Sequence, residues 1–237
     1  MGFERMTLPA PVIRKHDGFL VVRDDMLEGG TKRRVLGSLL ARWPNNEFVY
    51  ASMSGGYGPV ALAYACRDLG RRATLIYSWH KSKPLVEKAK AAGADIVMTP
   101  KPAFFNVVQK HARNYAQAHP EARLLKMGFD YPEFVEETAE LAGSLDVQPQ
   151  QVWCAGGSGA LTRALQKAWP GAEHHVVRVS SVRGDFGRAT QHMAPEKFTQ
   201  VAKIKPPFPS AKYYDAKIWR FVEELAEPGA LVWNVGA

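Results

Sequence analysis

The sequence is poor in cysteine and has no long apolar run. Only Cys66 and Cys154 occur among the 237 residues, too few for a disulfide framework or a set of zinc ligands. No apolar run approaches the roughly 18 residues that span a membrane, and residues 1–10 lack the apolar stretch of a secretory signal. We therefore expect no membrane partner, no resident metal and a cytoplasmic location.

The chain has fewer acidic than basic residues, and the basic residues form no single block. Its formal net charge is +8, and its isoelectric point is about 9.5. Such an excess favours anionic partners, which include phosphates and nucleic acid. Because the basic residues are spread along the chain, charge alone leaves open whether the partner is a polymer. A segment over residues 180–212 is irregular and basic, and we expect a long loop or flap there.

Strand-like and helix-like runs alternate along almost the whole chain. Alternation of this kind predicts an α/β protein with parallel sheets covered by helices on both faces, and ligands bind such sheets at the carboxyl ends of the strands. Strands are expected over residues 19–22, 47–51, 73–77, 94–98, 122–126, 151–155, 175–179 and 230–234. Helices are expected from Thr31 and over residues 59–69, 84–92, 106–118, 132–141, 161–169 and 213–225, with Asn106 as a cap.

The run Gly29-Gly30-Thr31-Lys32 follows the first strand and precedes a helix. Two glycines permit a sharp turn, and Thr31 is suited to cap the helix. Lys32 would then lie in the first turn, where the helix dipole and the neighbouring Arg33 and Arg34 disfavour its ammonium form. A lysine in such a place is a candidate nucleophile towards a carbonyl group. A solvated basic turn remains the alternative.

A second glycine turn, Gly156-Gly157-Ser158-Gly159, lies between a predicted strand and a predicted helix. Inward-pointing backbone N–H groups and the start of the helix suit a phosphate. The same residues nearly match the G-x-S-x-G elbow of a serine hydrolase, with Asp185 and His192 following in the required order. A third glycine turn, from Ser52 to Gly58, also precedes a helix and could hold a carboxylate or a second phosphate.

Taken in order, these motifs resemble those of the fold-type II pyridoxal-phosphate (PLP) enzymes, the tryptophan synthase β-subunit-like superfamily. Arg23-Asp24-Asp25 followed by Gly29-Gly30-Thr31-Lys32 is most similar to the aminocyclopropane-carboxylate deaminase and D-cysteine desulfhydrase branch. The resemblance covers most of the chain, including residues 214–217 and 234–237. It implies two lobes with parallel sheets: a larger cofactor-binding lobe from residues 1–30 and 128–237, and a smaller lobe from residues 31–127.

The resemblance also implies roles for individual residues. Lys32 would form the Schiff base with the cofactor and move protons, and Tyr214 would assist it near the substrate. The remaining implied roles are phosphate binding by Gly156, Gly157, Ser158 and Gly159, a ring-nitrogen contact by Asn234, and substrate binding by Ser54, Gly55, Gly56 and Tyr57. A homodimer is expected because members of this family are commonly dimers.

Three features depart from the family pattern. Gly56 stands where the family usually has Asn, and the Ser or Thr that is usual near Tyr57 is absent. Val235 replaces the Ser or Thr that would meet the ring nitrogen, so that Asn234 is the candidate substitute. The chain is also shorter than usual members, which implies a trimmed lid or subdomain. These changes put the usual substrate in question.

Four functions therefore compete. The first is a PLP-dependent lyase or deaminase acting at the α-carbon of a small amino acid. The second is a PLP-dependent decarboxylase or lyase acting on an amino acid attached to DNA, parallel to phage-type thymine hypermodification. The third is a non-catalytic PLP-binding protein, and the fourth is a serine hydrolase built on Ser158.

Overall fold

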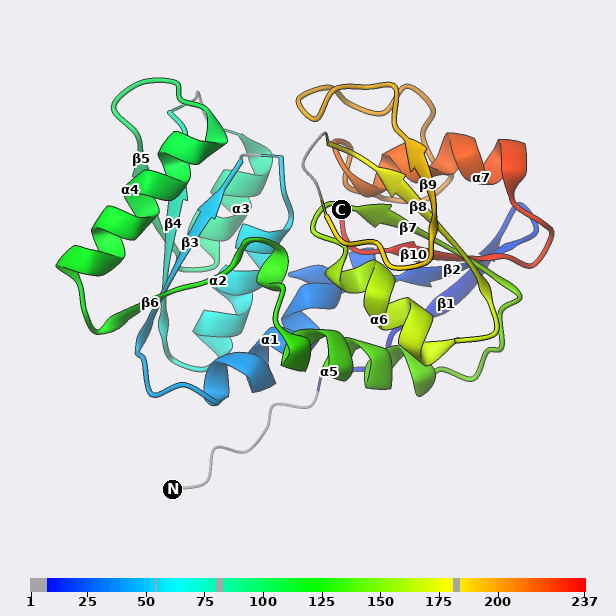
Figure 1. Ribbon diagram of the computed structural model, residues 1–237, viewed down its shortest axis with the longest axis horizontal. Coiled ribbons are helices and arrows are strands. Elements are labelled where there is room, and N and C mark those ends of the chain that lie inside the picture. The colour runs from blue at the N-terminus through cyan, green and yellow to red at the C-terminus, as the bar shows by residue number, and fades with distance from the viewer. Residues whose placement is uncertain (1–7, 54, 80–82, 181–183) are drawn as a thin grey trace. The chain divides into compact units, whose positions relative to one another are not determined.

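The computed structural model describes residues 8–53, 55–79, 83–180 and 184–237. The chain divides into two compact units, each with a sheet of its own (Figure 1). The larger unit contains Pro11–Gly30 and Gly128–Ala237, and the smaller unit contains residues 8–10 and Thr31–Met127. Within the described ranges, no helix has both the length and the apolar character needed to cross a membrane.

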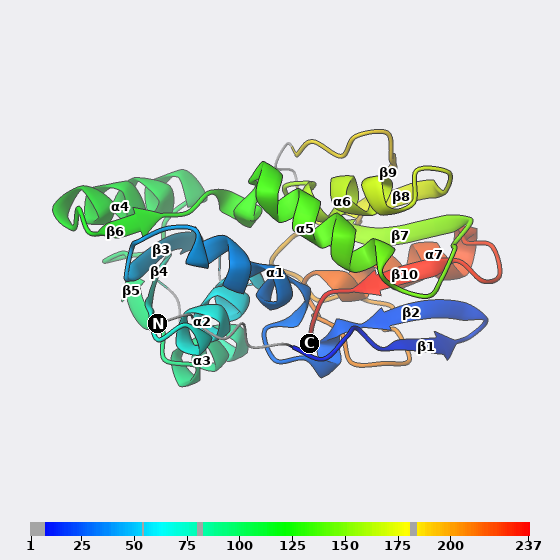
Figure 2. The ribbon, with the colours of Figure 1, turned by 90° about the horizontal axis from the view of Figure 1, so that it is seen from below.

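The larger unit is built on a six-stranded sheet in the order β1-β2-β10-β7-β8-β9. Its first four strands can be followed across the sheet in Figure 2. All neighbouring strands are parallel except β1 and β2, which form an antiparallel hairpin. The strands are β1 (Ile13–His16), β2 (Phe19–Arg23), β7 (Gln151–Gly156), β8 (Glu173–Arg178), β9 (Thr190–Met193) and β10 (Leu231–Asn234).

Helices cover both faces of this sheet. Successive strand residues point to opposite faces, and here both sets are apolar, so that both faces must be buried. Val22, Cys154 and Trp233 pack in one core with residues of α5 and α6, and their neighbours Val21 and Trp153 pack in another with residues of α7. Figure 1 shows α5 and α6 on one side of the strands and α7 on the other. The helical segments are η1 (Asp24–Met26), η2 (Met127–Phe129), α5 (Pro132–Gly143), α6 (Ala160–Ala168), η3 (Asp215–Ile218) and α7 (Trp219–Leu225).

The smaller unit holds a four-stranded, fully parallel sheet in the order β5-β4-β3-β6. On one face, Val49 and Ile76 pack against Val108 and Ala112 of α4, while α2 contacts β3 and β4. Figure 1 shows α4 and α2 on opposite sides of the strands. The elements are α1 (Gly30–Ala41), β3 (Glu47–Ser52), α2 (Gly58–Asp68), β4 (Arg72–Tyr77), α3 (Pro84–Ala91), β5 (Asp95–Met98), α4 (Phe105–Ala118) and β6 (Ala122–Leu124).

The architecture confirms the predicted α/β class with parallel sheets flanked by helices, but four local predictions are wrong. The helix expected over 213–225 is divided into η3 and α7. The irregular segment expected over 180–212 contains β9, which pairs in parallel with β8. Neither predicted cap forms, because α1 already begins at Gly30 and α4 begins at Phe105 without a side-chain cap.

Candidate functional site

The glycine turn of the larger unit lies at the carboxyl end of its sheet. Strand β7 ends at Gly156 and α6 begins at Ala160, so the turn is only three residues long. Gly159 caps α6 with a φ of 93°, a left-handed conformation that favours glycine. Gly157 and Ser158 are partly exposed while Gly159 is buried. The turn therefore places main-chain amides at a helix N-terminus, which is an arrangement suited to an anion.

Neighbouring groups leave almost no room for side chains in this turn. A Cβ atom added to Gly157 would lie 2.6 Å from the hydroxyl oxygen of Tyr214, and one added to Gly156 would lie 2.7 Å from Cε1 of Phe186. A Cβ atom on Gly159 would overlap the carbonyl oxygen of Asp185. The bare backbone of the turn is thus a steric requirement, and Tyr214 lies against it.

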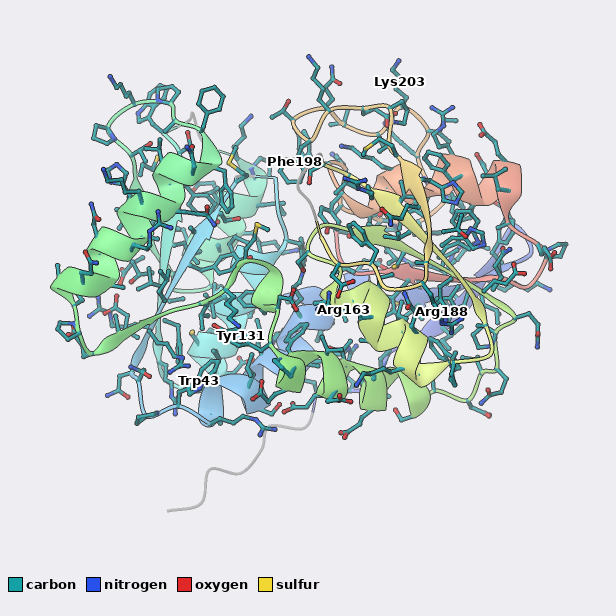
Figure 3. The ribbon with its side chains drawn as sticks, in the orientation of Figure 1. Trp43, Tyr131, Arg163, Arg188, Phe198 and Lys203 are labelled. Atoms are coloured by element: carbon teal, nitrogen blue, oxygen red, sulfur yellow. The ribbon has the colours of Figure 1, made fainter. Side chains whose placement is uncertain are left out.

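Arg163 of α6 holds the outer side of the turn in place (Figure 3). Its guanidinium group donates a 2.7 Å hydrogen bond to the carbonyl oxygen of Asp185 and pairs with the carboxylate of Asp130. The backbone N–H of Asp185 in turn donates to the carbonyl oxygen of Ser158 at 3.1 Å. These bonds connect the residues after β8 with the turn after β7.

Asn234, at the carboxyl end of β10, belongs to a buried polar network. Its Nδ2 donates to Oδ1 of Asp25 at 2.7 Å and to the carbonyl oxygen of Pro209 at 2.9 Å. Its Oδ1 accepts a 2.8 Å hydrogen bond from the hydroxyl of Ser210. Both amide hydrogens are therefore engaged with the protein, and any contact of Asn234 with a ring nitrogen would have to use Oδ1. That contact stays a prediction.

Lys32 lies in the first turn of α1, two residues after Gly30. Its side chain is partly exposed, whereas its neighbours Thr31 and Arg33 are buried. Nε of Arg33 pairs with Asp68 at 2.7 Å, and its guanidinium group lies 5.0 Å from the ring centroid of Tyr64. Arg33 is thus held within the smaller unit. The expected approach of Lys32 to the glycine turn stays a prediction.

The expected substrate loop precedes α2 in the smaller unit. Ser54 lies outside the described residues. Gly55 and Gly56 are partly exposed, and Tyr57 is buried with its hydroxyl accepting a 3.2 Å hydrogen bond from Nζ of Lys88. A Cβ atom on Gly56 would meet its nearest neighbour, Oγ of Ser52, at 3.5 Å. There is consequently space for a side chain where the family usually carries Asn.

The residues proposed for a serine hydrolase are not assembled into a triad. Nε2 of His192 lies 3.1 Å from Nδ1 of His175, and both rings stack on Trp153. Oδ1 of Asp185 accepts from the backbone N–H of Gly187. No hydrogen bond joins the side chains of Ser158, Asp185 and His192, all three of which the structure describes. This arrangement gives no support to the serine hydrolase interpretation.

Two further observations concern thiol nucleophiles and metal ligands. Burial raises the pKa of the Cys154 thiol to about 12 and that of Cys66 to the same value, so neither supplies a thiolate near neutral pH. Across the part of the chain that the structure describes, no three His, Cys, Asp or Glu side chains gather as metal ligands. Sequence spacing gave no signal for the supporting roles of Asp25, Asp130, Arg163 and Ser210.

Neither a protein-family model nor a curated protein sequence matches the chain. Its fold, however, matches solved structures. An ACC deaminase homologue is similar with a TM-score of 0.77 and 14% identity, over 92% of this chain and 84% of that one. The processed form of threonine deaminase isoform 2 from Solanum lycopersicum is similar with a TM-score of 0.68 and 12% identity, over 92% and 79%.

The apo form of diaminopropionate ammonia lyase from Escherichia coli is also similar, with a TM-score of 0.66 and 15% identity over 92% of this chain and 77% of that one. Another structure of that lyase contains an aminoacrylate–PLP azomethine reaction intermediate. At such low identities the likeness establishes the fold. This chain has the fold that these deaminases and this lyase share.

Proposed function

We propose that this chain is a PLP-dependent enzyme of the lyase or deaminase type that acts at the α-carbon of an amino-acid substrate. The observation that carries the proposal is the glycine turn after β7, whose backbone is closed in by Tyr214, Phe186 and Asp185 at the N-terminus of α6. The fold of known deaminases over 92% of the chain supports it.

The residues present fit the cofactor. The turn from Gly156 to Gly159 offers main-chain donors and a helix N-terminus, which suit the cofactor phosphate. Lys32 offers an amine in the first turn of α1, suited to covalent attachment to the cofactor aldehyde. When bound, PLP supplies a ring that accepts the electron pair released at the substrate α-carbon.

The proposed roles of the chain's own groups follow from their chemistry. The Lys32 amine would take the α-proton of the substrate and return it at a later step. The Tyr214 hydroxyl, placed against Gly157, is the proposed second proton-handling group. The amides near Gly55 and Gly56 are proposed to orient the substrate carboxylate, because α2 begins just after them.

Reconstitution with PLP tests the cofactor assignment directly. We expect near-visible absorbance that borohydride fixes to the peptide containing Lys32, located by mass spectrometry. Lys32→Ala should keep the fold and lose the covalent adduct. The proposal is wrong if the adduct forms only at other lysines, or if the protein stays colourless with PLP.

Catalysis is tested separately from cofactor binding. The loaded protein should exchange the α-hydrogen of at least one amino acid for deuterium in heavy water, as seen by NMR. Covalent PLP binding at Lys32 with no exchange over a full amino-acid panel would instead support the non-catalytic PLP-binding function.

A second candidate places the amino acid on DNA, with decarboxylation as the reaction. It is supported by the net charge of +8 and by exposed Lys197, Lys203, Lys205 and Lys212 after β9. Carbon dioxide release from an amino acid that is attached to thymine in an oligonucleotide with its carboxylate free, and none from free amino acids, would favour it. The proposed homodimer is tested by light scattering of the loaded protein.

A further inference from the structure

The smaller unit exposes five large apolar side chains on the segments between Trp79 and Val107. Trp79 is 46% exposed and Phe104 is 85% exposed. Val97, Met98 and Val107 are each 37–38% exposed. These five are close to half of the eleven large apolar side chains exposed among the described residues. Isolated exposed apolar side chains are ordinary, whereas a group of them marks an interaction site.

Hydrogen bonds hold the parts of this group together at the carboxyl ends of β4 and β5. The backbone N–H of Trp79 donates to the hydroxyl of Thr99 at 2.9 Å, and that hydroxyl donates to the carbonyl oxygen of Lys101 at 2.7 Å. The N–H of Ala103, next to Phe104, donates to the hydroxyl of Ser78 at 2.9 Å. Trp79 and Phe104 are therefore presented by connected backbone segments.

The group lies at an open edge of the sheet. Strand β5 is the terminal strand in the order β5-β4-β3-β6. Its Val97 pairs with Ile76 and so lies on the sheet face that α4 covers, whereas Met98 points to the opposite face. Phe104 is the extended residue just before α4, and its carbonyl oxygen accepts a 3.0 Å hydrogen bond from the backbone N–H of Val107 in the first turn. In Figure 1 the loop from β5 to α4 can be followed at the top of the smaller unit. We call Trp79, Val97, Lys101, Phe104 and Val107 the β5 edge surface.

The same part of the chain holds most of the excess positive charge. Residues 79–118 contain seven Lys and Arg residues and two acidic residues, which is a net charge of +5 out of the +8 of the whole chain. Lys83, Lys101, Lys110 and Arg113 are exposed. These exposed cations favour a negatively charged partner for the β5 edge surface.

Charge also distinguishes two candidate partners of this surface, a second copy of the chain and a nucleic acid. A two-fold dimer would place this surface against itself and bring two excesses of positive charge together, which is unfavourable. Exposed aromatic rings flanked by lysines are instead the combination by which proteins hold single-stranded nucleic acid, since bases stack on the rings and phosphates pair with the lysines.

We infer that the β5 edge surface binds single-stranded nucleic acid, with Trp79 and Phe104 as stacking platforms and Lys101 and Lys110 as phosphate contacts. The inference does not rest on the proposed function, because it uses no cofactor and no residue of the glycine turn. It is compatible with either candidate substrate.

Fluorescence polarisation of the full chain with a labelled 20-nucleotide single strand tests the inference. We expect binding that weakens with salt, and about tenfold weaker binding for Phe104→Ala, because a stacked base is lost. Lys101→Glu should weaken binding and lower the slope of log K against log salt by about 0.7 for the lost phosphate contact. Phe104 is 85% exposed, so its truncation should leave the fold intact.

Matched variants outside this surface serve as controls. Leu225→Ala removes another exposed apolar side chain, which is 52% exposed, and Lys15→Glu makes the same charge change on an exposed lysine of β1 in the larger unit. Both should bind within twofold of the unmodified protein. No binding at low salt, or equal losses for Lys15→Glu and Lys101→Glu with none for Phe104→Ala, would overturn the inference. Equal affinity for poly-glutamate would do the same and indicate an acidic protein partner.

Discussion

The side-chain amide of Asn234 donates a 2.7 Å hydrogen bond to the carboxylate of Asp25, which lies 209 residues earlier in the chain. The same carboxylate accepts two 2.8 Å hydrogen bonds from the guanidinium group of Arg23. These bonds connect the carboxyl ends of β2 and β10, which are paired in parallel with Arg23 opposite Asn234. They fix the position of a residue proposed to lie beside the cofactor.

Replacing Asn234 should test how much this network stabilises the larger unit. Asn234→Ala leaves buried partners without their bonds, and we expect a loss of about 1–3 kcal/mol in the free energy of unfolding. Asn234→Asp adds a buried negative charge next to Asp25, and we expect a loss of about 3–5 kcal/mol. Urea unfolding measures both. Equal losses for the two variants would contradict the charge argument.

A substitution at Tyr214 should compensate for the stability lost by a substitution at Gly157. Gly157→Ala places a methyl group 2.6 Å from the Tyr214 hydroxyl oxygen, so it should lower both stability and PLP affinity. Tyr214→Phe removes that oxygen and leaves Cζ as the nearest ring atom, at 3.6 Å. The double variant should therefore recover most of the lost stability, measured by thermal unfolding. Additive losses would show that the two residues do not meet.

Gly159 should be far less tolerant of substitution than an unconstrained glycine. Gly159→Ala combines a left-handed φ with overlap of the Asp185 carbonyl oxygen, and we expect a loss of about 2–4 kcal/mol. Gly171→Ala is the matched control because nothing lies within 4 Å of its added Cβ atom. Urea unfolding of the two variants gives the comparison, and losses within about 0.5 kcal/mol of each other would contradict it.

Burial lowers the pKa values of His175 and His192 below their usual 6.5, and the nearby charge of His192 further lowers the pKa of His175. Below pH 6.5 the unfolded chain binds protons that the folded chain does not, so the free energy of unfolding should fall as the pH falls from 6.5 through the lowered values. Each group contributes at most about 1.4 kcal/mol per pH unit, because each ring takes up at most one proton on unfolding.

His192→Gln should make that pH dependence shallower between pH 6.5 and 5. His111→Gln, on the exposed surface of α4, is the matched control. Urea unfolding at several pH values gives the slopes. The prediction fails if both variants keep the slope of the unmodified protein.

The parallel α/β architecture could be predicted because the local signals agreed with it. The apolar runs of β3, β4 and β7 are continuous, as expected for strands covered on both faces. Glycines and prolines marked most of the helix ends. Strand β9, Thr190–Met193, was missed because it is a partly exposed edge strand of polar residues with no apolar alternation.

The candidate site was less predictable than the fold. The glycine turn could be recognised from its composition, but the residues that close it, Asp185 and Phe186, lie in a segment without periodicity. The network around Asn234 depends on a contact between residues 209 positions apart, which spacing in the sequence cannot reveal. Thr31 is not the cap because α1 begins at Gly30, one residue before it, after a turn in which Gly29 and Gly30 have positive φ.

The place of β10 in the larger sheet has a consequence for biosynthesis. Strand β2, Phe19–Arg23, emerges early from the ribosome, yet one of its two sheet neighbours is β10, Leu231–Asn234. The smaller unit is almost entirely one continuous stretch and can close while translation proceeds. The hairpin of β1 and β2 must instead wait until β10 is made, and in that interval the unpaired edge of β2 is open to wrong pairing.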